Sequence, residues 1–334
     1  MHTEEMLNVY LNWGDLALET LQTDVLNKRL CEGCSYVVIS GMGGSGIAGD
    51  YIRVVADEYS RLPVYVVKDF ALPHWVRGGN AMVLSVSYSG NTLETIAAFE
   101  SALKRGVCVG VVTSGGELEV LARRYSVPLA LVRGGLVPRI AFPALLIASL
   151  RILWESGVDI VPQQVVTDSL SALRDDRARR EAEELAEFLK DSRLPVIVAP
   201  SRMAPLAIRA KNEFNENSKL PVKVEVAPEL FHNDIVGWEL RSFTDKAVLF
   251  LTGNRVEDEL TRFYGDILKD LGHDVYEVPL RGGSVLYKLL YGTLLVGLAS
   301  VYLARDRGVD PLETKTIARY KEFLKRLGDI RRWH

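Results

Sequence analysis

The stretch YVVISGMGGSGIAGD, residues 36–50, decides the fold of the first half of the chain. An apolar run rich in β-branched residues passes directly into glycines at positions 41, 43, 44 and 46, and a helical pattern follows. Glycine allows the backbone to approach an anion closely, and the first turn of a helix presents unpaired N–H groups to it. The stretch therefore predicts a strand, a phosphate-binding turn and a helix, in that order.

The same glycines satisfy the dinucleotide fingerprint G-x-G-x-x-G at Gly41, Gly43 and Gly46. Asp69, at the end of the next predicted strand, stands about where an acid that binds a ribose would be expected. Taken alone, this motif leaves an NAD-dependent dehydrogenase and a sugar-phosphate enzyme both open.

A second polar loop, SVSYSGNT at residues 85–92, separates these alternatives. The hydroxyl groups of Ser87, Ser89 and Thr92, with the first amides of the following helix, would donate hydrogen bonds to a compact phosphate. A simple helix cap at Asn91 and Glu94 would not need these hydroxyl groups. The loop therefore favours a phosphate monoester over a dinucleotide.

Predicted strands alternate with helical patterns along the whole chain. The predicted strands are residues 36–40, 64–67, 82–86, 107–112, 127–132, 196–199, 222–226, 247–251 and 275–278. Strands separated by helices indicate parallel sheets with right-handed crossovers. We therefore predict an α/β protein with two flavodoxin-like, doubly wound domains, residues 1–157 and 158–334. The second domain repeats the plan without the glycine-rich turn, which indicates an internal duplication whose second copy lost that loop.

Composition excludes several other classes of protein. The chain has 334 residues, of which 48% are hydrophobic and 25% charged, with a formal net charge of -3. This balance predicts no basic surface for nucleic acid. The acidic, amphipathic N-terminus is unlike a secretory signal, and the apolar stretch at 289–304 is shorter than the ~20 residues of a spanning helix. We expect a cytoplasmic protein that binds neither nucleic acid nor membranes.

Three cysteines raise the question of a metal or a disulfide. Cys31 and Cys34 have the spacing of a zinc or redox pair, but no second pair of Cys or His lies near them in the sequence. We interpret them as incidental loop cysteines, with a local disulfide as the alternative, and we expect no metal site.

The two polar loops also carry a resemblance to a known family. GMGGSG (41–46) followed by SYSGNTLET (87–95) resembles a sugar isomerase (SIS) domain. The chain is most similar to the archaeal bifunctional phosphoglucose/phosphomannose isomerases, and the similarity extends over nearly its whole length. The other segments that carry it are YLNW (10–13), VKDF (67–70), KNEFNENSK (211–219), PELFHN (228–233) and DPLETKTIARYK (310–321).

This resemblance implies two SIS domains in a homodimer that isomerises glucose 6-phosphate and mannose 6-phosphate without metal or organic cofactor. It also implies which residues bind the substrate. The phosphate would be held by hydroxyl groups, and two glycines would let the backbone approach the substrate. These residues are Ser45, Ser87, Ser89, Thr92, Gly43 and Gly44.

An aldose-ketose isomerase needs a base, a group that stabilises the enediolate and an acid or base that opens the sugar ring. The resemblance places the base at Glu216, although Glu213 lies one helical turn earlier and could be confused with it. Arg139 would stabilise the enediolate oxygens, because its charge is permanent. His232 would relay a proton to the ring oxygen, because imidazole titrates near neutral pH.

The C-terminal segment completes the implied site. Lys321 matches a family lysine that would help to open the ring, and Thr314 matches a threonine associated with accepting the mannose epimer. The resemblance further implies that His232 is donated across the dimer interface. For each of these residues a structural role is the alternative: an ion-paired Arg139, a structural loop histidine at 232 and a solvated Lys321.

Two other functions stay open at this point. An NAD-dependent dehydrogenase would use the glycine-rich loop and would change nicotinamide absorbance. A non-catalytic sensor of sugar phosphates would keep the phosphate loops but would have no need of Glu216, Arg139 and His232 together.

Overall fold

The computed structural model describes residues 2–240 and 243–326 and divides into two compact units. We call them the N-terminal unit, residues 15–166 with 314–326, and the C-terminal unit, residues 2–14 with 167–313. The sequence predicts one boundary between residues 157 and 158. In the structure the chain passes from one unit to the other near residue 166. The first residues, 2–14, belong to the C-terminal unit, and residues 314–326 belong to the N-terminal unit.

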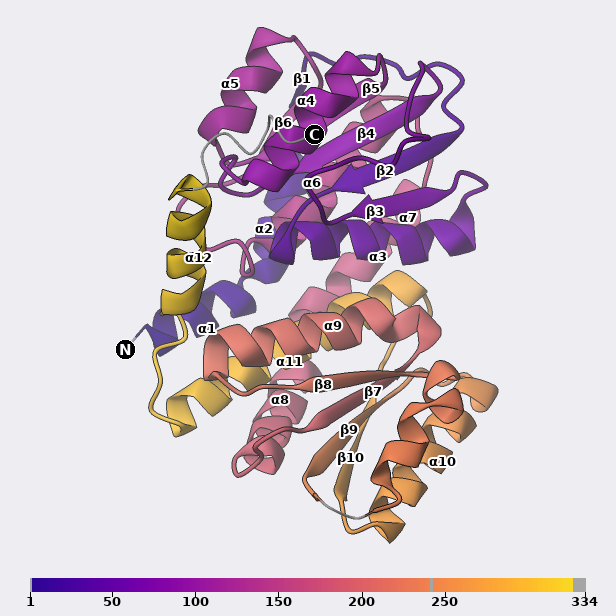
Figure 1. The fold of residues 1–334 in the computed structure, drawn as a ribbon, viewed down its shortest axis with the longest axis vertical. Helices are drawn as coiled ribbons and strands as arrows, with labels where there is room; N and C mark the ends of the chain where they lie inside the picture. Colours follow the sequence, from indigo (N-terminus) through magenta and orange to yellow (C-terminus); the bar gives the residue numbers. More distant parts are fainter. Residues whose placement is uncertain (1, 241–242, 327–334) are drawn as a thin grey trace. The chain divides into compact units, whose positions relative to one another are not determined.

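The N-terminal unit is built on a six-stranded sheet with the order β1-β6-β5-β4-β2-β3 (Figure 1). Its strands are β1 (Val25–Leu26), β2 (Tyr36–Ser40), β3 (Val64–Val67), β4 (Ala81–Val86), β5 (Cys108–Thr113) and β6 (Leu129–Leu131). Strands β2 to β6 are parallel, and β1 pairs antiparallel with β6. Apart from β1, this is the predicted flavodoxin-like order.

Helices cover both faces of this sheet. The helices that pack on it are α3 (Gly43–Tyr59), α4 (Leu93–Lys104), α5 (Gly116–Arg124) and α6 (Phe142–Glu155). The unit also contains α12 (Lys315–Arg326) and most of α2 (Trp13–Leu21). Helices α4 and α5 share a buried apolar cluster with Val38, Val83 and Val111. Side chains alternate across a strand, so Ile39 points to the other face, where Gly49 of α3 packs against it.

The C-terminal unit repeats this plan with four parallel strands in the order β10-β9-β7-β8. These are β7 (Val196–Pro200), β8 (Lys223–Ala227), β9 (Lys246–Leu251) and β10 (Asp274–Pro279). In both units the chain crosses to one side of the first strand and then to the other, which agrees with the predicted duplication. All strands predicted from the sequence are present, with small shifts at their ends.

The C-terminal unit contains α-helices and several short helical turns. The α-helices are α1 (Thr3–Leu11), α8 (Asp176–Leu189), α9 (Ala204–Glu213), α10 (Arg255–Asp270) and α11 (Val285–Asp306), and α7 (Gln163–Ser169) lies where the two units join. Short helical turns are η1 (Leu170–Arg174), η2 (Ser201–Met203), η3 (Phe214–Ser218), η4 (Glu229–His232) and η5 (Asp234–Trp238). Helix α10 covers one sheet face together with η4 and η5, through Leu249, Leu230 and Tyr264.

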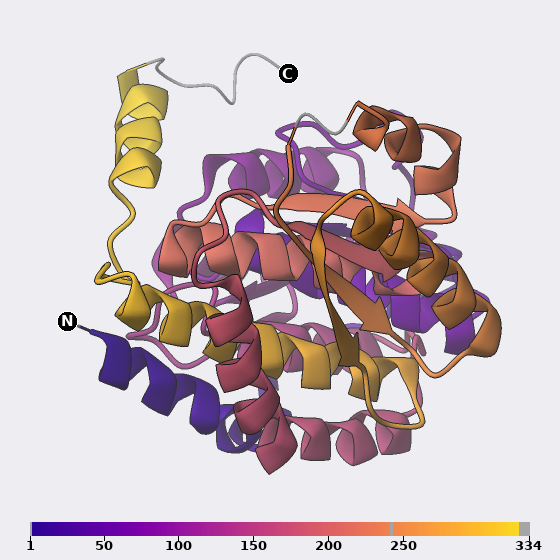
Figure 2. The same ribbon diagram turned by 90° about the horizontal axis from the view of Figure 1, so that it is seen from below.

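Helix α11 is the central helix of the C-terminal unit. By length and composition it could cross a membrane, but 89% of that window is buried within the protein, as expected of a core helix. Helix α1 lies alongside it (Figure 2), and Gly297 leaves the space that the ring of Tyr10 occupies. This contact explains why the first residues of the chain belong to the C-terminal unit.

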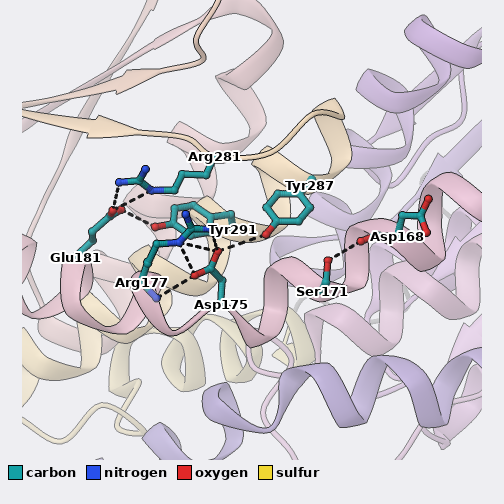
Figure 3. Close-up of polar contacts among 8 residues, drawn as sticks. All are labelled: Asp168, Ser171, Asp175, Arg177, Glu181, Arg281, Tyr287 and Tyr291. Atoms are coloured by element: carbon teal, nitrogen blue, oxygen red, sulfur yellow. Dashed lines mark hydrogen bonds and ion pairs between the residues drawn. The ribbon is translucent and has the colours of Figure 1, made fainter.

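A polar network joins the start of α8 to α11 (Figure 3). Arg281 pairs with Glu181 at 2.7 Å, and the Tyr291 hydroxyl donates to the same carboxylate at 2.6 Å. Asp175 caps α8 by accepting from the backbone N–H of Arg177, and the Arg177 guanidinium beside it lowers the pKa of this carboxyl. The network fixes α8 against α11 within this unit.

Candidate functional site

The two predicted phosphate loops meet at the carboxyl edge of the N-terminal sheet. The loop at 41–46 follows β2, and the loop at 87–92 follows β4, its neighbour in the sheet. The chain leaves β2 toward β3 on one side and reaches β4 on the other, so the loops flank the topological switch point. Ligands of open α/β sheets bind at this position.

Glycine is required in the first loop for two reasons. Gly43 has φ +51°, and a Cβ built there would meet no other group within 4 Å, so its backbone faces open space. A Cβ on Gly44 would lie 3.1 Å from the Pro138 carbonyl oxygen and 3.2 Å from the Arg139 Cα. The small residue at 44 therefore allows the segment carrying Arg139 to pack against the loop.

Hydroxyl groups connect the two loops directly. Ser45 is 4% exposed, and its Oγ accepts a hydrogen bond of 3.2 Å from the backbone N–H of Tyr88. Ser87 is 1% exposed and donates to Thr92 Oγ1 at 2.9 Å. Ser89 is exposed, and its Oγ accepts from the Asn91 N–H at 3.3 Å. The four predicted phosphate-binding side chains thus lie on two loops that contact each other.

Tyr88 is a residue of this site that the sequence analysis did not identify. Its hydroxyl donates to the Arg133 carbonyl oxygen at 3.0 Å and accepts from the Leu136 N–H at 2.8 Å. These bonds hold the segment that leads to Arg139. An aromatic residue between two serines gives no spacing signal for such a role, because its partners lie more than forty positions away in the chain.

Arg139 is 6% exposed and precedes α6. Its main chain contacts Gly44, so the structure brings it to the phosphate loops as predicted. A buried guanidinium keeps its full charge and suits anionic oxygen atoms of a substrate.

Helix α12 is tied to the same edge of the N-terminal unit. The Tyr320 hydroxyl donates to Glu94 Oε1 at 3.0 Å, and Glu94 lies in the first turn of α4, directly after the second phosphate loop. Burial and the Glu94 carboxylate raise the pKa of the Tyr320 hydroxyl. Lys321 follows Tyr320 and is exposed, and Thr314 lies just before α12. Glu94 and Tyr320 lie 226 positions apart, so no local pattern indicates that they are partners.

In the C-terminal unit the structure distinguishes the two candidate glutamates. Glu213 is buried, forms an ion pair with Arg209, and accepts hydrogen bonds from the Tyr10 hydroxyl at 2.6 Å and from Asn217 Nδ2 at 2.8 Å. All of these partners belong to the same unit. Glu213 therefore has a structural role in fixing α1 and α9.

Glu216 has a different environment. It is partly exposed and lies in the π-helical turn η3, which ends at Lys219 in the left-handed conformation (φ +56°). The Lys219 ammonium group donates to the Glu216 carbonyl oxygen and, at 3.0 Å, to that of Asp310, so the turn is anchored to the end of α11. Turns of this kind inside helices occur frequently at functional sites.

His232 lies at the end of η4, after the cis Ala227–Pro228 peptide, and is exposed. Glu216 precedes β8 and His232 follows it. Five strand residues span about 16 Å, so the two side chains lie at opposite ends of β8 rather than next to each other. This placement suggests that the two predicted residues serve different ends of the strand within one chain.

Two further groups of residues relate to a dinucleotide site and to a metal site. Asp69, the possible ribose acid, accepts a hydrogen bond from its neighbour, the Phe70 N–H, at 2.6 Å. Among the described residues, no group of three or more His, Cys, Asp or Glu side chains is arranged to hold a metal ion.

Comparison with known proteins shows the family. The chain is 36% identical over 98% of its length to a bifunctional phosphoglucose/phosphomannose isomerase of Aeropyrum pernix, and the match covers 99% of that protein. The chain belongs to the bifunctional phosphoglucose/phosphomannose isomerase family. A bifunctional phosphoglucose/phosphomannose isomerase of Aquifex aeolicus is 33% identical to this chain. The match covers 87% of this chain and 90% of the length of that protein.

Two further comparisons concern the domain and the fold. Residues 178–324 match the family described as bacterial phospho-glucose isomerase C-terminal SIS domain. The C-terminal domain of glucosamine-fructose-6-phosphate aminotransferase from Francisella tularensis has the same fold, with a TM-score of 0.73 and 16% identity, over 91% of this chain and 97% of that one. The predicted SIS fold is confirmed.

Proposed function

We propose that this protein interconverts glucose 6-phosphate and mannose 6-phosphate with fructose 6-phosphate. The observation that carries the proposal is the cradle formed by Ser45, Ser87 and Thr92 beside the buried Arg139. The names of the relatives agree with this activity, since they are phosphoglucose/phosphomannose isomerases.

In this proposal the phosphate ester lies at the switch point of the N-terminal sheet. Ser87 donates to Thr92 Oγ1 in the structure, and both hydroxyl groups can turn toward a phosphate oxygen instead. The amides at the start of α4 add partial positive charge, because the ends of helices carry unpaired N–H groups. This assigns the phosphate to the residues predicted from the sequence.

The proposed chemistry is a proton transfer between C1 and C2 through a cis-enediol. Glu216 is the base, Arg139 stabilises the charge on the enediolate oxygens, and His232 and Lys321 assist ring opening. One carboxylate can serve both C2 epimers if the substrate rotates about its C2–C3 bond. Thr314 is the residue that allows the site to accept mannose 6-phosphate as a substrate.

We further propose a homodimer in which each protomer gives His232 to its partner. The support is that Glu216 precedes β8 and His232 follows it, which places the two residues toward opposite ends of this strand. A loop histidine that extends beyond the sheet is available to a second chain. We place the enzyme in the cytoplasm, as expected from its composition.

Substituting Ser87 tests the phosphate cradle. Ser87→Ala removes one hydroxyl donor to a dianion, so KM for glucose 6-phosphate should rise about tenfold or more, with a smaller change in kcat. Ser101→Ala on α4, away from the loops, is the matched control and should leave both constants unchanged. An unchanged KM in Ser87→Ala would remove this residue from the phosphate site.

Exhaustive chelation tests the assignment of charge stabilisation to Arg139. If the guanidinium balances the enediolate charge, the enzyme should keep its full activity after dialysis against EDTA. Loss of activity with EDTA, restored by added zinc, would contradict this assignment.

A direct assay separates the proposal from its alternatives. The purified protein is supplied with glucose, mannose or glucosamine 6-phosphate, and fructose 6-phosphate is measured with a coupling enzyme. Turnover of the first two without any nicotinamide requirement supports the isomerase. Binding without turnover would favour a sensor, and a nicotinamide-dependent absorbance change would favour a dehydrogenase.

A further inference from the structure

The three cysteines of the chain gather at one place in the N-terminal unit, away from the isomerase site. Cys31 Sγ lies 4.0 Å from the Gly79 carbonyl oxygen and 3.7 Å from that of Ala81. Cys108 Sγ lies 3.7 Å from the same Gly79 oxygen. Residues 31 and 108 are far apart in sequence, so the fold brings these thiols together.

Cys31 and Cys34 are the first and last residues of a tight turn. The Cys34 N–H donates to the Cys31 carbonyl oxygen at 3.3 Å, and Gly33 has φ +64°. These features define a tight turn, in which the Cα atoms of its first and last residues lie within about 7 Å. A disulfide requires Cα atoms about 4.4–6.8 Å apart, a range that overlaps the separation across such a turn.

The two thiols differ in exposure and reactivity. Cys34 is partly exposed, and the hydrogen bond from the Cys31 thiol lowers its pKa to about 7, with smaller contributions from the main chain of Tyr36 and Met82. Cys31 is 4% exposed, and its pKa is raised, chiefly by the same hydrogen bond and then by burial. A thiol with a pKa of about 7 is half ionised at pH 7, against about 3% for an ordinary cysteine.

A cavity of about 670 Å³ opens beside this cluster. Cys31 and Cys108 line it, together with Arg29, Glu32 and Gly79. The cavity is large enough for a small organic molecule. Cys34 does not line it, so the cavity lies beside Cys31 rather than beside Cys34.

We propose that Cys31 and Cys34 form a reversible dithiol-disulfide couple that reacts with small-molecule disulfides, with Cys34 as the attacking thiol. The Cys34 thiolate attacks one sulfur of the small disulfide, whose S–S bond breaks and releases one thiolate. Cys31 then attacks the Cys34 sulfur of the mixed disulfide, loses its proton and releases the second thiolate. The two protein thiols are oxidised by two electrons, and the small disulfide is reduced to two thiols.

The structure explains why the second step can follow the first. The Cys34 thiolate is the main cause of the raised pKa of Cys31. Once Cys34 is part of a mixed disulfide it carries no charge, so this cause disappears and Cys31 becomes easier to ionise.

The couple is separate from the isomerase site. Cys34 precedes β2 and Cys108 begins β5, so both lie at the amino edge of the sheet, whereas the phosphate loops follow the carboxyl ends. The length of β2 places about 16 Å between these edges. Oxidation should therefore leave isomerase activity nearly unchanged, which provides a check that the oxidised protein stays folded.

The test uses the reduced full chain and oxidised glutathione as the probe. After acid quenching, free thiols are alkylated and located by peptide mass spectrometry. We expect Cys31 and Cys34 to lose alkylation together and to appear linked within one peptide, while Cys108 stays alkylated. The rate should be half-maximal near pH 7, the pKa of the attacking thiol.

Three variants identify the role of each sulfur. Cys31→Ser should accumulate glutathione on Cys34, Cys34→Ser should react about tenfold more slowly or less, and Cys108→Ser should behave like the native chain. A link between Cys31 and Cys108, glutathione on Cys108 alone, or a native chain whose Cys34 stays fully alkylated would each overturn the proposal. The native-chain measurement decides the question even if a variant does not fold.

Discussion

Replacing Glu216 with glutamine is expected to lower the isomerisation rate about 10²- to 10⁴-fold, the usual contribution of a general base. The change removes only the group that moves the proton and keeps the size and hydrogen-bonding capacity of the side chain. Because Glu216 is partly exposed in η3, the melting temperature should change little. Binding of the phosphate ester should be nearly intact, since the cradle belongs to other residues.

Glu213→Gln is the matched control. It is expected to lower the stability of the protein but to leave most of its turnover. It breaks a buried ion pair with Arg209 and weakens the hydrogen bonds from Tyr10 and Asn217. Loss of one partner of a buried pair costs about 3–5 kcal/mol, so the melting temperature should fall clearly. The folded fraction should keep most of its turnover. A dead Glu213→Gln variant beside a fully active Glu216→Gln variant would show that the base lies at 213.

Mixing Glu216→Gln with His232→Ala is expected to restore about a quarter of native activity from two inactive proteins. The expectation follows if each site combines Glu216 of one chain with His232 of the other. In a mixed dimer one site then carries both substitutions and the other carries none. Random pairing makes about half of the dimers mixed, and half of their sites are intact.

The experiment requires proof that subunits exchange. Native mass spectrometry of the mixture gives the fraction of mixed dimers, and activity should rise in proportion to it. The control is a mixture of two variants that both lack the carboxylate, Glu216→Gln and Glu216→Ala. Every site of their mixed dimers lacks Glu216, so no activity should return. Exchange without recovery in the first mixture would mean that His232 serves its own chain or that the dimer has another arrangement.

Most of the fold could be predicted because each strand carries its own apolar, β-branched pattern. The exception is β1, a pair of residues at the sheet edge that pairs antiparallel with β6. So short a segment has no detectable alternation, and only its tertiary partner defines it. The exchange of terminal segments between the units was likewise not predictable, because the contacts of Tyr10 with Gly297 and of Tyr320 with Glu94 join positions far apart in the chain.

The site could be predicted where a motif is local. The loops at 41–46 and 87–92 each contain their own phosphate-binding groups, and the structure brings them together with Arg139. Glu213 and Glu216 could not be separated by spacing, because helical periodicity places them on one face. The structure distinguishes them because Glu216 lies in the π-helical turn at 214–218, whereas Glu213 is bound by Tyr10 and Arg209.

The measurement that tests the central proposal most directly follows deuterium from C2 of glucose 6-phosphate. The protein is incubated with substrate labelled at C2 in ordinary water, and the products are identified by NMR. We expect fructose 6-phosphate and mannose 6-phosphate to form, with deuterium lost to solvent or moved to C1. Turnover that leaves deuterium at C2, for example epimerisation at another carbon, or no turnover at all, would contradict the proposed proton transfer.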